Sequence, residues 1–136
     1  MAQIASYEGI TVLIIEDEPS TRLLIKRLLL QIGIVSVVEA KDGKSGLDEA
    51  MRTRPTIILC DVHMEPVGGR AFLKMLRGLK ARALAMTPVI FLTADSQRDT
   101  VLFAKEHHVN GYLAKPVSLT DLKTRIDAVL KGTAPG

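Results

Sequence analysis

The sequence predicts an α/β fold, a doubly wound open sheet of five parallel strands with helices packed on both faces, written (βα)5. Two observations predict it. Short apolar and β-branched runs alternate with longer segments of helical period, which is typical of parallel strands joined by crossover helices. Runs such as Val12–Ile15 and Ile57–Cys60 are continuously apolar, as expected of strands covered by helices on both sides.

Five strands are expected, and helices follow them in order. The strands are Thr11–Glu16, Ile34–Glu39, Thr56–Cys60, Pro88–Thr93 and Gly111–Ala114. Pro19 fits the first position of the helix after the first strand. Ser96 with Asp99, and Ser118 with Asp121, have the spacing of a capping box, so helices are expected to begin there.

The length of 136 residues is typical of one domain. We expect residues 10–131 to form this domain, with residues 1–9 as an N-terminal extension. Gly132 suits the end of the last helix, and residues 132–136 are expected to form a C-terminal tail.

Composition narrows the functional classes. Hydrophobic residues make up 47% of the chain and charged residues 24%, enough for a core without disulfides. The single cysteine, Cys60, is expected to be an inert, buried strand thiol. No apolar run approaches the ~20 residues of a membrane span, and no signal peptide is recognisable, so we expect a cytoplasmic protein without a membrane partner. The net charge of +3 comes from dispersed bases without a nucleic-acid-binding motif, which argues against nucleic acid.

Charged and polar residues follow the predicted strands. In open α/β sheets, ligands bind beyond the carboxyl ends of the strands, where the strand order reverses. A common order, 2-1-3-4-5, would place Asp61 centrally, with Asp17 on one neighbouring strand and Thr93 on the other. Lys115 would start two strands away, roughly 10 Å from Asp61. Its long side chain can close that gap.

Three carboxylates, those of Glu16, Asp17 and Asp61, are expected to cluster at this edge. Clustered carboxylates repel one another unless a cation lies between them, and oxygen ligands favour Mg²⁺. The backbone carbonyl of His63 is a further candidate ligand, favoured over its imidazole. Asp17 taken alone is also explained as a helix cap.

A carboxylate beside Mg²⁺ and a lysine can attack phosphorus, because both cations offset the charge of a phosphoryl group. Asp61 is then the phosphoacceptor, and Thr93 and Lys115 contact the phosphate. Taken singly, Thr93 is also explained as a strand terminus and Lys115 as an ordinary strand exit.

With these residues in place, the chain resembles the receiver domains of bacterial two-component response regulators, over about residues 10–131. The matching segments are Leu13–Pro19, Asp61–Met64, Phe91–Ala94 and Gly111–Pro116. The resemblance implies a flavodoxin-like, CheY-like fold and a stand-alone regulator of a phosphorelay. It implies a histidine kinase or histidine phosphotransfer protein as donor. The chain would be no conventional enzyme, but a phosphoacceptor that assists its own phosphorylation and dephosphorylation.

The resemblance also implies how phosphorylation is communicated to a downstream protein. In the family, the equivalent of Thr93 moves toward the phosphate and the aromatic equivalent of Tyr112 turns inward. The face built from the fourth helix, the fifth strand and the fifth helix, here about residues 96–131, then changes. We expect it to contact a downstream protein, with the chain a monomer or weak dimer.

Three features depart from the family pattern. Glu16 replaces the more usual aspartate, so metal contact there is expected to run through water. Glu65 stands where a proline is common, with Pro66 one place later, which alters the loop after Asp61. The connection 80–87 is long and is expected to extend or decorate the third helix.

Other classes of protein fit less well. A flavodoxin-like electron carrier lacks its phosphate loop here, because Glu16–Glu18 would repel a flavin phosphate. The D-x-D-x-T pattern of haloacid-dehalogenase phosphatases fails at Pro19, and the D-x-D pair of Toprim enzymes fails at His63. Two alternatives stay open: a receiver-like module that binds partners without phosphorylation, and a receiver fragment of a longer regulator.

Overall fold

The computed structural model describes residues 6–94 and 109–132, and these ranges contain a five-stranded parallel sheet in the order β2-β1-β3-β4-β5. The strands are β1 (Thr11–Ile15), β2 (Ser36–Ala40), β3 (Ile57–Asp61), β4 (Val89–Thr93) and β5 (Gly111–Ala114). The predicted fold class and strand order are confirmed. The bounds differ from the prediction by up to two residues, and β3 includes Asp61 because Asp61 is paired with Leu92 of β4.

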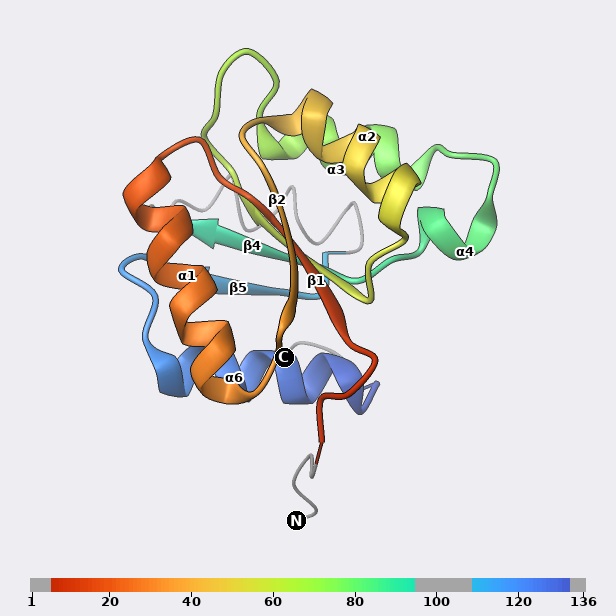
Figure 1. The fold of residues 1–136 in the computed structure, drawn as a ribbon. Coiled ribbons are helices and arrows are strands. Elements are labelled where there is room, and N and C mark those ends of the chain that lie inside the picture. The colour runs from red at the N-terminus through yellow and green to blue at the C-terminus, as the bar shows by residue number, and fades with distance from the viewer. Residues whose placement is uncertain (1–5, 95–108, 133–136) are drawn as a thin grey trace.

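Helices cover both faces of the sheet (Figure 1). They are α1 (Pro19–Ile32), α2 (Gly43–Thr53), α3 (Gly69–Arg77), α4 (Arg82–Ala85) and α6 (Leu119–Leu130). As predicted, Pro19 opens α1, and the Ser118 side chain caps α6 by accepting a hydrogen bond from the Asp121 backbone N–H. The cap predicted at Ser96 lies outside the described residues. No helix within those residues is long and apolar enough to cross a membrane.

Two apolar layers enclose the sheet, one on each side. Leu13 and Phe91 belong to the layer under α2 and α3, whereas Ile14 and Leu59 belong to the layer under α1 and α6. All four side chains are fully buried. Full burial of such a side chain stabilises the fold by roughly 1.5–3 kcal/mol. Because consecutive residues face opposite layers, a one-residue slip of a strand would exchange the two sets. This fixes the register, and with it the residue that ends each strand.

The long connection before β4 contains a separate short helix, α4, so it decorates α3 rather than extending it. Arg77, at the end of α3, donates from Nη1 to the carbonyl oxygens of Ala85 and Thr87, both at 2.8 Å. The Thr87 hydroxyl in turn donates to the Leu84 carbonyl at 2.7 Å. These bonds satisfy carbonyls at the end of α4 and hold the connection beside the strand that follows.

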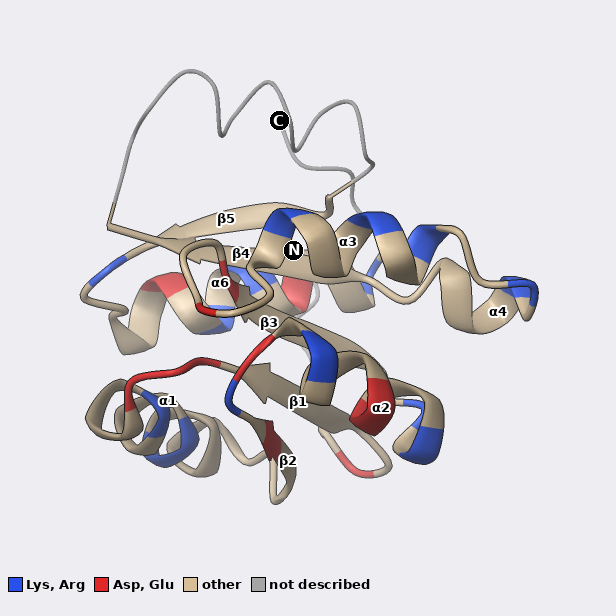
Figure 2. Cartoon of the chain, turned by 90° about the horizontal axis from the view of Figure 1, so that it is seen from above, with Lys and Arg blue, Asp and Glu red and all other residues tan. Residues whose placement is uncertain are grey.

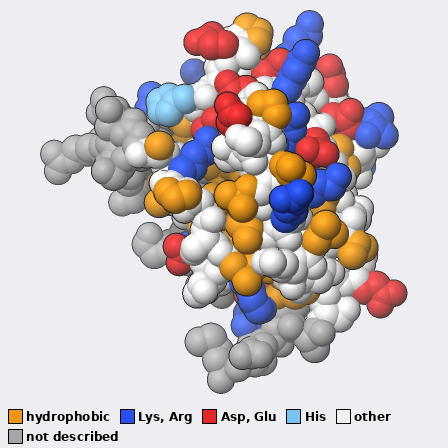
Figure 3. Space-filling model, turned by 60° about the vertical axis from the view of Figure 1, so that its left-hand side comes forward, with side chains coloured by type: hydrophobic (Ala, Val, Ile, Leu, Met, Phe, Trp, Pro, Cys, Tyr) orange, Lys and Arg blue, Asp and Glu red, His pale blue; other side chains and the backbone are white. Residues whose placement is uncertain are grey.

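The exposed side of α1 carries three leucines among polar and basic residues. Leu23, Leu24 and Leu30 are each more than two-fifths exposed. Figure 3 brings this side of the molecule forward and shows hydrophobic side chains interleaved with basic ones. The basic residues Arg22 and Lys26 lie toward β2, where both pair with Glu39. Because their side chains are largely exposed, Leu23, Leu24 and Leu30 add little to the core.

A three-residue polar cluster joins the N-terminal segment to α6. The Tyr7 ring belongs to the layer under α1 and α6, and its hydroxyl donates to Asp127 Oδ1 at 2.6 Å. Lys123 Nζ donates to the Tyr7 hydroxyl at 2.7 Å and to Asp127 Oδ2 at 2.9 Å. Burial raises the pKa of the Asp127 carboxyl. The hydrogen bonds from Tyr7 and Lys123 lower this pKa by more, so the resulting pKa lies below the ordinary value.

Asp127→Asn should therefore lower the free energy of unfolding in a pH-dependent way. A carboxyl with a depressed pKa stabilises the folded state above its ordinary pKa of 3.8, and this contribution is lost as the pH falls through the lower folded value. We expect a loss of about 1 kcal/mol at neutral pH, from weakened hydrogen bonds. Urea unfolding of wild type and variant should show the difference shrinking in acid. An equal difference at every pH would contradict the assignment.

Candidate functional site

The carboxyl ends of β1 and β3 bring the acidic residues together. Figure 2 shows acidic segments at these strand ends, next to the start of α1. Glu16 and Asp17 follow β1, and Asp61 ends the adjacent β3. One carboxylate oxygen from each of the three lies within 4.8 Å of the others. The predicted acidic cluster is thus present in the fold.

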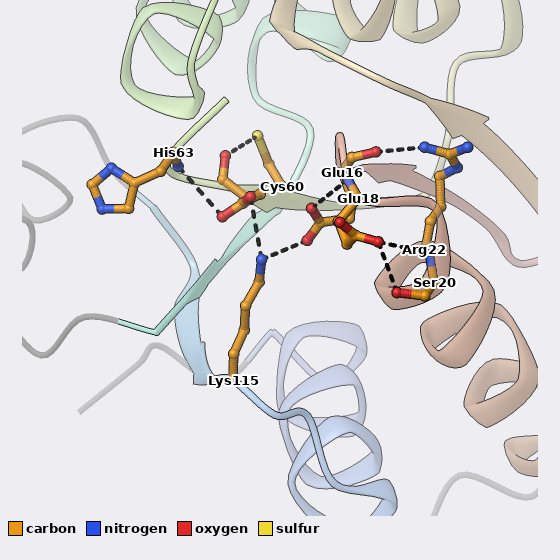
Figure 4. Close-up of polar contacts among 8 residues, drawn as sticks. Glu16, Glu18, Ser20, Arg22, Cys60, His63 and Lys115 are labelled. Atoms are coloured by element: carbon orange, nitrogen blue, oxygen red, sulfur yellow. Dashed lines mark hydrogen bonds and ion pairs between the residues drawn. The ribbon is translucent and has the colours of Figure 1, made fainter. Parts of the chain in front are cut away.

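Lys115 reaches this cluster from the segment after β5. Its Nζ lies 2.6 Å from Glu16 Oε1 and 3.2 Å from Asp61 Oδ2 (Figure 4). Burial lowers the pKa of the Lys115 ammonium, but contacts with the two carboxylates raise it more, so the resulting pKa is above the ordinary value. The long side chain spans the distance from β5 as the sequence predicted. The peptide bond between Lys115 and Pro116 is cis.

Glu16 is the most enclosed member of the cluster, with none of its surface exposed. Its Oε2 accepts a hydrogen bond from the Glu18 backbone N–H at 3.0 Å. Its backbone carbonyl accepts from Arg22 Nη1 at 2.7 Å, and Arg22 also pairs with Glu39. Sequence reasoning missed Arg22, because a basic residue in the first turn of a helix gives no sign of which carbonyl it will reach.

Asp17 is exposed and does not cap α1. The cap is Glu18, whose side chain accepts from the Ser20 backbone N–H, so the explanation of Asp17 as a helix cap is wrong. The pKa of the Asp17 carboxyl is raised, first by burial and then by hydrogen bonding and charge repulsion with Glu16. Repulsion of this kind is relieved when a cation binds between the carboxylates.

Asp61 is 5% exposed and sits centrally in the sheet, as predicted. Its Oδ1 accepts from the His63 backbone N–H at 3.3 Å, while the His63 ring points away from the cluster (Figure 4). An imidazole ligand is therefore not supported. Next to Asp61, the buried Cys60 thiol donates to the Asp61 carbonyl at 3.3 Å, and burial raises the pKa of that thiol well above its ordinary value. Cys60 is a packed strand thiol, as expected.

Thr93 and Tyr112 lie on the other side of Asp61. Thr93 is buried and ends β4, one residue beyond Leu92, which pairs with Asp61. Tyr112 is half-buried on β5 opposite Phe91, and burial raises the pKa of its hydroxyl. It also lines a cavity of about 140 Å³ between β5 and α6. Of the face predicted to contact a downstream protein, β5 and α6 are described, whereas residues 96–108 lie outside the described part of the chain.

Two glycines hold the loop after Asp61 close to its neighbours, and the sequence did not reveal this. The Gly43 N–H donates to the Val67 carbonyl at 2.8 Å, and a Cβ on Gly43 would lie 2.6 Å from Val67 Cγ1. Gly69 is packed so closely on the Asp61 carbonyl oxygen that a Cβ there would overlap it. Glu65 is exposed in this loop and precedes a cis Pro66.

The arrangement combines a hard-cation site with an anion site. Oxygen ligands from Asp17 and Asp61 suit a divalent cation, and the Lys115 ammonium beside Asp61 suits an anionic group bound to that carboxylate. A family model described as the response regulator receiver domain matches residues 12–127. The chain belongs to the response regulator receiver family.

Individual relatives agree with this assignment. The chain is 31% identical to the chemotaxis protein CheY of Pseudomonas aeruginosa over 121 residues, which cover 88% of this chain and 95% of that protein. The solved structure of chemotaxis protein CheY4 of Vibrio cholerae matches with a TM-score of 0.80 and 28% identity, covering 88% of this chain and 98% of that one. The chain is therefore a CheY-like receiver domain of two-component signalling.

A further solved structure contains a metal ion. It is the receiver domain of sensor histidine kinase PA1611 from Pseudomonas aeruginosa, with a TM-score of 0.79, 27% identity and coverage of 92% of this chain and 99% of that one. That protein has a magnesium ion coordinated in its active-site cleft. In this receiver, Glu16, Asp17 and Asp61 form an acidic cluster that could hold a metal ion.

Gly69→Ala should destabilise the fold and disturb the site together. The new methyl group would meet the backbone oxygen of Asp61, which cannot move without shifting β3 or the loop. We expect a loss of about 1–3 kcal/mol, as for other overpacked sites. Gly78→Ala is the matched control, since the nearest heavy atom to its Cβ would lie at 3.4 Å. Equal urea midpoints for the two variants would contradict the packing argument.

Proposed function

We propose that this receiver is a phosphorylation switch that accepts a phosphoryl group on Asp61. The observation that carries the proposal is the placement of Asp61: a buried carboxylate at a strand end, 3.2 Å from the Lys115 ammonium and grouped with two further carboxylates. The donor would be a phosphohistidine of a histidine kinase or phosphotransfer protein. The downstream target would be a protein that contacts the face that includes β5 and α6.

Asp17 and Asp61 would hold Mg²⁺ directly, together with the His63 backbone carbonyl, and Glu16 would add negative charge and contact the ion through water. The carboxylate cluster fits such an ion, because three acidic groups within 4.8 Å of one another offer oxygen ligands and repel one another without a cation. When bound, the ion would offset charge on the phosphoryl oxygens and on the acceptor.

Phosphoryl transfer would use this chain's residues as follows. A carboxylate oxygen of Asp61 forms the new P–O bond while the P–N bond to the donor imidazole breaks, and the imidazole leaves with that bonding pair. Lys115 contacts a phosphoryl oxygen, and the Thr93 hydroxyl donates to another. The receiver thus assists its own phosphorylation, and the same groups would assist hydrolysis of the aspartyl phosphate.

Thr93 and Tyr112 would transmit the effect of Asp61 phosphorylation to the face at β5 and α6. Thr93 ends the strand beside Asp61, and Tyr112 lies on the next strand, half-buried at the edge of a cavity against α6. A phosphoryl group that draws Thr93 inward would leave room for the Tyr112 ring to follow. The phosphoryl group supplies a contact that differs between two states, which is sufficient to shift their populations.

Asp61→Asn should abolish phosphorylation while leaving the fold intact, because the amide keeps the shape of the carboxylate but is no nucleophile. Wild type and variant would be incubated with acetyl phosphate, with Mg²⁺ and then with EDTA, and their intact masses compared. We expect a Mg²⁺-dependent gain of ~80 Da, one phosphoryl group, in the wild type only. Labelling that persisted in the variant would place the acceptor elsewhere.

No gain in either protein would leave two explanations: a receiver that accepts only from a protein donor, or a module that binds partners without phosphorylation. Incubation with phosphorylated histidine phosphotransfer proteins separates them. Transfer from such a donor supports the proposed function, and its absence with every donor favours the docking module.

The Lys115→Ala variant should be phosphorylated slowly, and its phosphorylation should not produce the change at Tyr112. The variant lacks the ammonium that contacts Asp61, so both the transfer and the response to the phosphoryl group should weaken. The measurement is the change in the Tyr112 amide resonance on phosphorylation, compared with Lys26→Ala, which removes a lysine of α1 that pairs with Glu39. An unaltered Tyr112 response in Lys115→Ala would count against the role of Lys115.

A further inference from the structure

Each carboxylate oxygen of Glu16 has a polar contact in the described part of the chain, a hydrogen bond at Oε2 and an ion pair at Oε1. Oε2 accepts the Glu18 backbone N–H at 3.0 Å, and Oε1 lies 2.6 Å from Lys115 Nζ. The side chain is fully buried, and its backbone carbonyl is fixed by Arg22. A buried carboxylate needs a counter-charge, so the contact with Lys115 stabilises Glu16 as well as the lysine.

The two contacts of Lys115 are unequal. Its Nζ is 0.6 Å closer to Glu16 Oε1 than to Asp61 Oδ2, the difference between 3.2 and 2.6 Å. Figure 4 shows the lysine side chain extended, with its ammonium directed toward Glu16. An ammonium drawn toward Glu16 neutralises Asp61 less than one paired with Asp61 alone.

We propose that Glu16 is a positioning residue, which acts on Asp61 through Lys115. It holds the ammonium beside Asp61, where a phosphoryl oxygen would meet it, and prevents it from pairing fully with the acceptor oxygen. The length of a glutamate matters, because its extra methylene lets one carboxylate reach both Lys115 and the Glu18 N–H. Direct metal contact then falls to Asp17, which is exposed and caps no helix, and to Asp61.

The consequence for phosphorylation rests on the proposed function, whereas the ion pair itself does not. Glu16→Asp keeps the charge and the ability to bind Mg²⁺ but shortens the side chain. The rate of phosphorylation by acetyl phosphate would be measured against Mg²⁺ concentration. We expect the maximal rate to fall about tenfold, because the ion pair that holds the Lys115 ammonium in place is weakened, with unchanged half-saturating Mg²⁺.

Glu18→Gln is the matched control, because it changes a neighbouring exposed carboxylate whose side chain accepts hydrogen bonds from Ser20. Its rate should equal that of the wild type. A Glu16→Asp rate that recovers fully at high Mg²⁺ would make Glu16 a metal ligand and overturn the proposal.

A second measurement tests the ion pair without phosphorylation. Metal-free proteins would be treated with acetic anhydride, and labelling of each lysine followed by peptide mass spectrometry. Lys115 should label several-fold faster in Glu16→Asp and in Glu16→Gln, a variant that keeps the side-chain length and the bond from Glu18. Lys123, paired with Asp127 on α6, is the internal control.

The outcomes separate the two proposals. Unchanged labelling of Lys115 in both folded variants overturns the positioning role, whatever the phosphorylation data show. Faster labelling together with a wild type that no donor phosphorylates supports the ion pair and refutes the phosphorylation switch. Far-UV circular dichroism establishes that each variant is folded.

Discussion

The structure depends on the concentration of negative charge at one edge of the sheet. Three carboxylates lie within 4.8 Å of one another, and two of them, Glu16 and Asp61, are buried. Buried like charges destabilise a fold unless a cation compensates them. Lys115 contacts both buried carboxylates, and this partly offsets their repulsion in the absence of a metal. The remaining excess of negative charge favours a divalent cation bound between the carboxylates.

The rest of the fold brings the three carboxylates and the Lys115 ammonium together. The strand order puts the end of β3 between the ends of β1 and β4, and two apolar layers fix the register of each strand. Arg22 anchors the turn that carries Glu16, and close packing of Gly69 anchors the loop after Asp61. The site is therefore formed at strand ends of fixed register and by loops that are anchored to them.

Sequence reasoning predicted the strands, their order and the positions of Asp61 and Lys115, because apolar runs and the residues that end them are local features. It was less accurate at strand ends, where pairing with a neighbour decides the last residue, as for Asp61. It left Asp17 open as a helix cap, since acidic residues at a helix start look alike in sequence. Glu18 holds that role, because its carboxylate reaches the Ser20 N–H.

The sequence by itself determined the fold class, the family and the chemical types available at the sheet edge. Periodicity and residue type encode these, and neither needs coordinates. The tertiary structure alone decided which acidic group is fully buried, which one the ammonium approaches most closely, and which distant side chains hold the loops. Such contacts join residues as far apart as Glu16 and Lys115, and their distances depend on how whole strands and helices pack.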